Sequence, residues 1–100
     1  MNIVKELGEP AVLEQLAEEC TELAQAALKY ARLMRGENPT PKTEEECLKA
    51  LAEEMADTRL CIDLIDGVHH FNYSLVMDAK EARWKRRIEE NGNDLPNRGE

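Results

Sequence analysis

The sequence of 100 residues has few of the residues that build β-sheets and long loops. It contains four aromatic residues, five glycines, four prolines, four valines and four isoleucines. Strands favour β-branched and aromatic side chains, whereas alanine, leucine and glutamate favour helices. A hydrophobic share of 42% and a charged share of 34% are typical of a helical globular protein. We therefore expect an all-α fold.

Long apolar segments and paired cysteines are also absent from the sequence. No apolar run approaches the about 18 residues of a membrane span, and no basic segment followed by an apolar one opens the chain. Cys20, Cys47 and Cys61 form no Cys-x-x-Cys pair, and each lies in a helical apolar pattern. This pattern indicates reduced, buried thiols and not a disulfide framework or a zinc site. We expect a cytoplasmic protein that is neither exported nor membrane-spanning.

Positive charge is scarce and is concentrated in one segment. The chain has 21 acidic and 13 basic residues, a net charge of -8, and five of the basic residues fall within residues 80–87. Most of the surface would repel a nucleic acid, so we expect no nucleic-acid partner. A small anion, held jointly by a cation and by the basic segment, is compatible with this distribution.

The first long helix is predicted over about residues 10–34. A short helical lead-in precedes it and is interrupted at Gly8, and Pro10 suits the first turn of the long helix. Gly36 and the two prolines that follow it end the helix. Helical spacing predicts a buried stripe formed by Leu13, Leu16, Cys20, Leu23, Ala27 and Ala31.

The second long helix is predicted to begin at a capping box. Thr43 and Glu46 have the Thr-x-x-Glu spacing in which each side chain bonds to the backbone N–H of the other residue. The helix should continue to about Asp66 and end at Gly67.

A third, shorter helix is expected over about residues 74–90. The remainder, residues 91–100, is polar and rich in turn residues, which predicts a disordered tail. We therefore expect one helical domain over residues 1–90, with two long antiparallel helices and a third completing a bundle. Three helices would leave apolar faces uncovered, so oligomerisation into a homodimer or a homotetramer is expected to complete the bundle.

Two acidic pairs occupy the two long helices. Glu19 with Glu22, and Glu54 with Asp57, are three residues apart and so project from neighbouring turns of one helix face. A single pair would usually be a solvated surface feature. Both pairs, however, lie among apolar residues, and converging carboxylates in such surroundings need a cation. Oxygen ligands favour Mg²⁺ or Mn²⁺, so these four residues are the predicted metal ligands.

Histidine is not expected in this site. A di-iron helical bundle would show Glu-x-x-His pairs, and neither acidic pair contains one. His69 and His70 follow the second helix, where we interpret them as loop or packing residues.

Two short segments resemble the EExxE and ExxD motifs of the MazG-like, all-α nucleoside triphosphate pyrophosphohydrolases. They are Glu18 to Glu22 (EECTE) and Glu54 to Asp57 (EMAD). Relatives of this family include dimeric dUTPases and phosphoribosyl-ATP pyrophosphohydrolases. The resemblance covers about residues 10–88 and includes the order of the helices. It implies hydrolysis of nucleoside triphosphates to the monophosphate and pyrophosphate. It also implies Mg²⁺ ligands at Glu19, Glu22, Glu54 and Asp57.

The last helix extends the resemblance. The family often has a lysine, an asparagine four residues later and an arginine three beyond that, for the substrate phosphates. Lys80 and Arg87 match this spacing, but Trp84 stands in the place of the asparagine. With Arg83, which shares their face, they are the implied phosphate-binding residues. The alternative is a solvated basic helix end, favoured by the helix dipole, with Trp84 in a core or an interface.

The implied mechanism is attack of a water on the α-phosphorus, with Glu18 or Glu53 as the base. The segment between the two motifs is long for the family, so residues 36–42 are expected to form a lid or an oligomer contact. Two alternatives stay open. One is a non-catalytic helical interaction module whose acids are surface charges, and the other is a specialised phosphoribosyl-ATP or dUTP pyrophosphohydrolase of the same fold.

Overall fold

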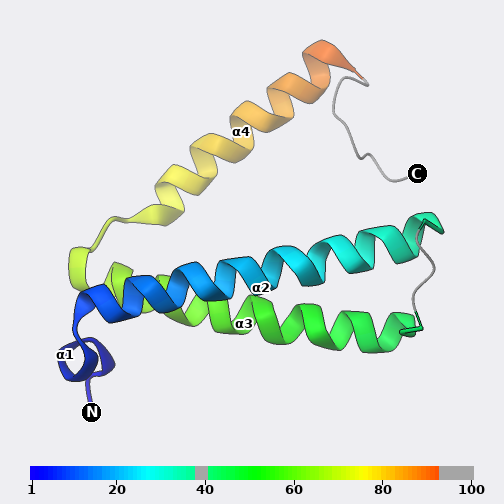
Figure 1. Cartoon of the computed structure of the whole chain (residues 1–100). Helices are drawn as coiled ribbons and strands as arrows, with labels where there is room; N and C mark the ends of the chain where they lie inside the picture. The colour runs from blue at the N-terminus through cyan, green and yellow to red at the C-terminus, as the bar shows by residue number, and fades with distance from the viewer. Residues whose placement is uncertain (38–40, 93–100) are drawn as a thin grey trace. The chain divides into compact units, whose positions relative to one another are not determined.

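The computed structural model describes residues 1–37 and 41–92 of the chain. All regular secondary structure in these residues is helical, which confirms the predicted all-α class (Figure 1). The chain divides into two compact units, Met1–His69 and a second that begins at His70. The expected single domain over residues 1–90 stays a prediction. The four helices are α1 (Ile3–Leu7), α2 (Glu9–Arg35), α3 (Glu44–His69) and α4 (Tyr73–Asn91).

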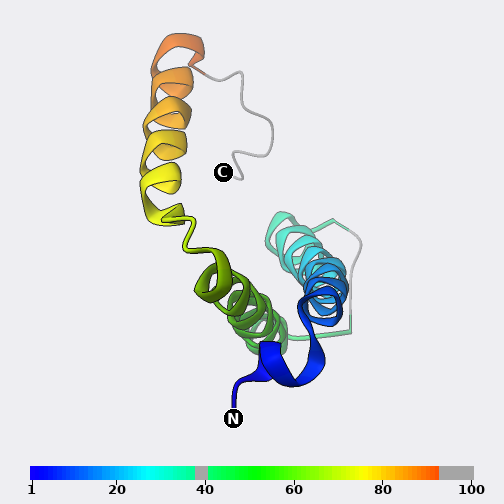
Figure 2. The same cartoon turned by 90° about the vertical axis from the view of Figure 1, so that its left-hand side faces the viewer.

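The first unit is an antiparallel helical hairpin. Helices α2 and α3 lie side by side along their length, and α1 packs at the end where α2 begins and α3 finishes (Figures 1 and 2). The contacts between the long helices include the following two. Thr58 donates a long hydrogen bond of 3.4 Å from its hydroxyl to the backbone carbonyl of Glu19, and His69 contacts Glu9 at the end of the hairpin.

The face of α2 that packs on α3 is offset from the predicted stripe by one position along the sequence. Val12 and Ala26 are buried, whereas Leu13, the first residue of the predicted stripe, is 45% exposed. Leu16 and Leu23 are half-buried and lie at the border between the two stripes. Because neighbouring stripes share such positions, periodicity alone does not select the inner one. Packing against α3 selects it, and α3 buries Cys47, Thr58, Cys61 and Ile65 in return.

The same shift explains the exposure of one cysteine. Cys47 and Cys61 are buried free thiols, as predicted, but Cys20 is an exposed free thiol. The prediction of three buried cysteines was therefore wrong for Cys20. This residue follows the half-buried Glu19 and lies one position outside the face of α2 that packs on α3.

The predicted ends of α2 and the predicted start of α3 are confirmed. Gly36 adopts the left-handed conformation (φ 73°) at the end of α2, and its backbone N–H donates to the carbonyl of Leu33 at 3.2 Å. In the capping box, the backbone N–H of Glu46 donates to Thr43 Oγ1 at 3.1 Å. The backbone N–H of Thr43 donates to Glu46 Oε1 at 2.8 Å.

The end of α3 was predicted too early. Gly67 lies inside the helix, which continues to His69. A glycine is compatible with helical backbone angles, so it is a weak stop signal unless the chain must turn there. The left-handed residue that follows the helix is His70, with φ of 55°.

Helix α4 begins at Tyr73, one residue before the predicted start, and follows Asn72, which has a left-handed backbone. Its large apolar side chains are exposed in the second unit, among them Met77 at 57% and Trp84 at 56%. Residues 38–40 of the predicted lid loop and residues 93–100 of the predicted tail lie outside the described residues. Among the helices described, none is both long and apolar enough to cross a membrane.

Candidate metal centre

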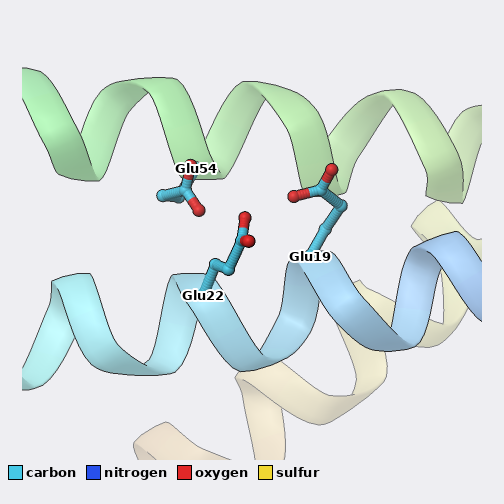
Figure 3. A group of neighbouring side chains, drawn as sticks. All are labelled: Glu19, Glu22 and Glu54. Atoms are coloured by element: carbon cyan, nitrogen blue, oxygen red, sulfur yellow. The ribbon is translucent and has the colours of Figure 1, made fainter.

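Three carboxylates meet in the hairpin between α2 and α3. Glu19 and Glu22 come from neighbouring turns of α2, and Glu54 comes from the middle of α3. One side-chain oxygen of each lies within 4.8 Å of the corresponding oxygens of the other two. Figure 3 shows the three side chains extending into the space between the two helices. We call this group the carboxylate cluster.

Two members of the cluster occupy positions that would otherwise be apolar. Glu19 is half-buried and lies three residues after Leu16 and four before Leu23, on the face of α2 that packs on α3. Glu54 is also half-buried and lies four residues before the buried Thr58. Residues at these spacings share a helix face, so packing of the two helices brings the acids together.

The cluster has no basic counter-charge among residues 1–37 and 41–92. The ion pairs in these residues include Arg59 with Asp63, Lys85 with Glu81, and His69 with Glu9, and none of these three includes a cluster carboxylate. Like charges this close repel one another, and repulsion favours either protonation or binding of a cation.

The environment of Glu19 shows this repulsion. The Gln15 side-chain amide donates a 3.0 Å hydrogen bond to Glu19, which acts to lower the pKa of the carboxyl. Desolvation, a hydrogen bond with Glu22, and the negative charges of Asp57 and Glu22 act in the opposite direction. The net result is a pKa of Glu19 above its ordinary value. A bound divalent cation would offset the part of this increase that comes from the charges of Asp57 and Glu22.

Asp57 lies beside the cluster but is not a member of it. Its side chain is exposed, and with Glu19 it lines a pocket next to the cluster. The structure thus brings together three of the four predicted ligands, with the fourth close enough for its charge to act on Glu19. Glu18 and Glu53, the predicted bases, are exposed and lie outside the cluster. The assignment of these acids to a metal site and to catalysis stays a prediction.

Two residues that contact Glu19 of the cluster were not predicted from the sequence. Gln15 precedes Glu19 by four residues, a spacing that could have identified it as a hydrogen-bond partner on the same helix face. Thr58 is 5% exposed and contacts the backbone of Glu19 from α3. Its role depends on the register of the two helices, and no local pattern signals it.

The predicted phosphate-binding residues lie in the second unit. Lys80, Arg83 and Arg87 are exposed side chains of α4, and Lys80 and Arg87 are seven residues apart on one face. Trp84 is exposed within the same stretch. Their contact with a substrate stays a prediction.

The donor set of the cluster suits a hard divalent cation. Carboxylate oxygens are preferred by Mg²⁺ and Mn²⁺, whereas a zinc or copper site would usually include histidine or cysteine. Mg²⁺ commonly uses one or two carboxylates, keeps several waters and contacts substrate phosphates. The cluster therefore has the chemistry to hold such an ion between α2 and α3.

Comparison of the chain with protein-family models, with curated proteins and with solved structures finds no match. The resemblance to the MazG-like family therefore depends on the two short acidic motifs and on the order of the helices.

Proposed function

We propose that the protein is a Mg²⁺-dependent nucleoside triphosphate pyrophosphohydrolase, which cleaves its substrate to the nucleoside monophosphate and pyrophosphate. The observation that supports this most is the carboxylate cluster of Glu19, Glu22 and Glu54. Two helices each place an acid on the face where they pack together, with no basic partner among the described residues. Such an arrangement is costly for stability alone and useful for binding a cation and a polyphosphate.

Glu19, Glu22 and Glu54 would hold the cation, and Asp57 would complete the ligand set. When bound, a divalent ion neutralises phosphate charge and lowers the pKa of water. Mn²⁺ would serve as well as Mg²⁺, because both prefer oxygen ligands.

Side chains of the protein would carry out the proton transfer and compensate the charge of the leaving group. Glu18 or Glu53 accepts a proton from the water that attacks the α-phosphorus, as the bond from that phosphorus to the bridging oxygen of the β-phosphate breaks. Both are exposed and hence accessible to that water. Lys80, Arg83 and Arg87 offset the charge of the departing pyrophosphate.

We also propose that copies of the chain associate into a homodimer or a homotetramer that completes the helical bundle. Large apolar side chains are exposed on all three long helices, among them Leu28 at 52%, Met55 at 55% and Leu75 at 64%. An exposed apolar surface of this kind is usual at interfaces and rare on stable monomers. The free, buried thiols of Cys47 and Cys61 support a cytoplasmic location for this activity.

A non-catalytic interaction module is the second candidate. The exposed apolar side chains of α4, such as Met77 and Trp84, favour it, because they would suit a partner helix. Isothermal titration with Mn²⁺ separates the two functions. The enzyme should release or take up heat at a carboxylate site, and this heat should disappear in Glu54→Gln, whereas a module should show none in either protein.

A nucleotide screen tests the proposed activity directly. Canonical and modified nucleoside triphosphates, including dUTP, and phosphoribosyl-ATP would be incubated with Mg²⁺ or Mn²⁺, and pyrophosphate release would be measured. We expect release that requires the divalent ion and is lost in Glu54→Gln. Preference for dUTP or phosphoribosyl-ATP would identify a specialised hydrolase. Absence of pyrophosphate release from every substrate would rule the proposal out.

A further inference from the structure

A pocket of about 380 Å³ lies next to the carboxylate cluster, within the first unit. Helices α1, α2 and α3 all contribute to its wall. Glu19 and Asp57 line it, so it is continuous with the candidate metal centre. This volume is within the range of roughly 300 to 1,000 Å³ that is usual for small-molecule sites.

The pocket extends from the carboxylates toward α1. Ala11 precedes Glu19 by eight residues on α2, which corresponds to about 12 Å along the helix. Leu64 follows Asp57 by seven residues on α3, about 10 Å in the same direction, because the two helices are antiparallel. Leu7 of α1 lines the pocket as well. One end of the pocket is therefore acidic, and the other is formed by aliphatic side chains.

The wall beyond the two carboxylates offers little hydrogen bonding. Gln15 is the one neutral amide among the described residues that line it, and the amide nitrogen of Gln15 already donates to Glu19. Cys61 also lines the pocket, and desolvation by burial raises the pKa of its thiol, followed in effect by the charges of Glu19 and Asp57. The thiol is therefore neutral at physiological pH and acts as a small, nearly apolar group.

We infer that this pocket receives the base of the nucleoside triphosphate and selects it by size and apolar contact, not by its hydrogen-bonding pattern. The inference depends on the proposed function, because a polyphosphate bound through a cation beside Glu19 and Asp57 would direct the uncharged end of the same molecule into the pocket. A base is planar and largely apolar on its faces, which suits aliphatic walls such as Leu60 and Leu64.

The polarity of the wall limits how well the site can discriminate between bases. Sites that hydrogen-bond a substrate group reject an analogue lacking that group by roughly 10⁴ to 10⁵-fold, whereas apolar pockets discriminate by only about 10 to 200-fold. We therefore expect kcat/KM for the four canonical bases to differ by no more than about 200-fold. A preference of about 10⁴-fold or more between two bases of equal size would overturn the inference.

A substitution that fills the pocket tests its location. Ala11→Phe should lower kcat/KM for nucleotides by at least about 10-fold, because the added ring occupies the space of the base. Ala24→Phe adds the same ring at an exposed position of α2 away from the pocket lining and should leave kcat/KM unchanged. Mn²⁺ affinity, and binding of inorganic tripolyphosphate in the presence of Mn²⁺, should be the same in both variants and in the wild type, since neither ligand has a base.

The outcomes separate the inference from the proposed function. Pyrophosphate release by the wild type, with an equal kcat/KM for Ala11→Phe, would overturn the pocket assignment alone. Absence of release by the wild type would overturn the proposed function and the inference with it. If Ala11→Phe is not folded by circular dichroism, Leu60→Trp replaces it, because Leu60 lines the pocket and is 55% exposed. The same loss of kcat/KM is expected.

Discussion

The first turn of α3 and the middle of the α2–α3 hairpin both contain glutamates. The fold shifts the pKa of a carboxyl group in opposite directions in these two regions. In the capping box, Glu46 accepts the backbone N–H of Thr43 at 2.8 Å. This backbone bond is the largest cause, followed by the Thr43 side chain, of a pKa of Glu46 below its ordinary value. In the carboxylate cluster, the hydrogen bond from Gln15 acts to lower the pKa of Glu19, but desolvation, Glu22 and Asp57 together outweigh it and raise the pKa.

The difference distinguishes a structural acid from a candidate ligand. Glu46 has its hydrogen-bond donors within the fold and lies in the first turn of α3, where the helix dipole also favours negative charge. Nothing further is needed to stabilise its ionised form. The cluster carboxylates are crowded, and their mutual repulsion favours either protonation or a cation from outside the chain. Charge balance, and not the number of acids, is what separates the two regions.

The largest expected effect is loss of activity when one of the proposed metal ligands is altered. Glu19→Gln and Asp57→Asn should each lower metal-dependent pyrophosphate release by at least about 1,000-fold, with the fold retained. Glu46→Gln, the matched substitution in the capping box, should leave kcat close to that of the wild type. Near-normal turnover of Glu19→Gln at saturating Mg²⁺ would show that the cluster is not the metal site.

A smaller loss is expected from the basic residues of α4. Lys80→Ala and Arg87→Ala should each lower kcat/KM by roughly 10 to 1,000-fold, because each removes a charge-assisted bond to the leaving pyrophosphate. Lys85→Ala is the control, since Lys85 lies within 4.0 Å of Glu81 on the same helix. Mn²⁺ affinity without nucleotide should not change. Weaker Mn²⁺ binding with unaltered nucleotide kinetics would assign these residues a structural role.

Addition of Mn²⁺ should stabilise the wild type by about 2.7 kcal/mol when the ion is at 100 times its Kd, provided that the unfolded chain does not bind it. The increase in Tm follows from binding to the folded cluster alone. Glu22→Gln should remove most of this increase, and Glu46→Gln should keep it. Thermal melts with and without the ion measure the effect, and equal increases in all three proteins would mean that Mn²⁺ binds elsewhere.

The smallest expected effect is an opposite response of the two regions to pH, measured as Tm with a chelator present. The pKa of Glu46 is lowered by folding, so its contribution to stability is present above the unfolded pKa and is lost as pH falls through the lowered value. The pKa of Glu19 is raised, so its contribution is present below the unfolded pKa and is lost as pH rises through the raised value.

At neutral pH, Glu46→Gln should therefore melt below the wild type and Glu19→Gln above it. Both differences should shrink as the pH becomes acidic. If Glu19→Gln instead melted below the wild type at neutral pH, the proposed repulsion within the cluster would be wrong.

The boundaries of α2 and α3 could be predicted closely because their signals are local. Gly36 ends a helix through its own backbone conformation, and Thr43 and Glu46 cap one through bonds within four residues. The exception was Gly67, because a glycine stops a helix only if the chain turns there. The spacing of Glu19 and Glu22 was equally local, since neighbouring turns of one helix bring them together without any help from the rest of the fold.

The sequence by itself determined that the chain is helical, where most of its helices begin and end, and that each long helix has an acidic pair on one face. Only the tertiary structure decided which stripe of α2 is buried, that Glu54 joins Glu19 and Glu22 while Asp57 lines the adjacent pocket, and that Cys20 is exposed. The physical reason is the register of two antiparallel helices. A helical period of 3.6 residues leaves neighbouring stripes nearly equivalent, and only contacts between the helices, such as that of Thr58 with Glu19, select one of them.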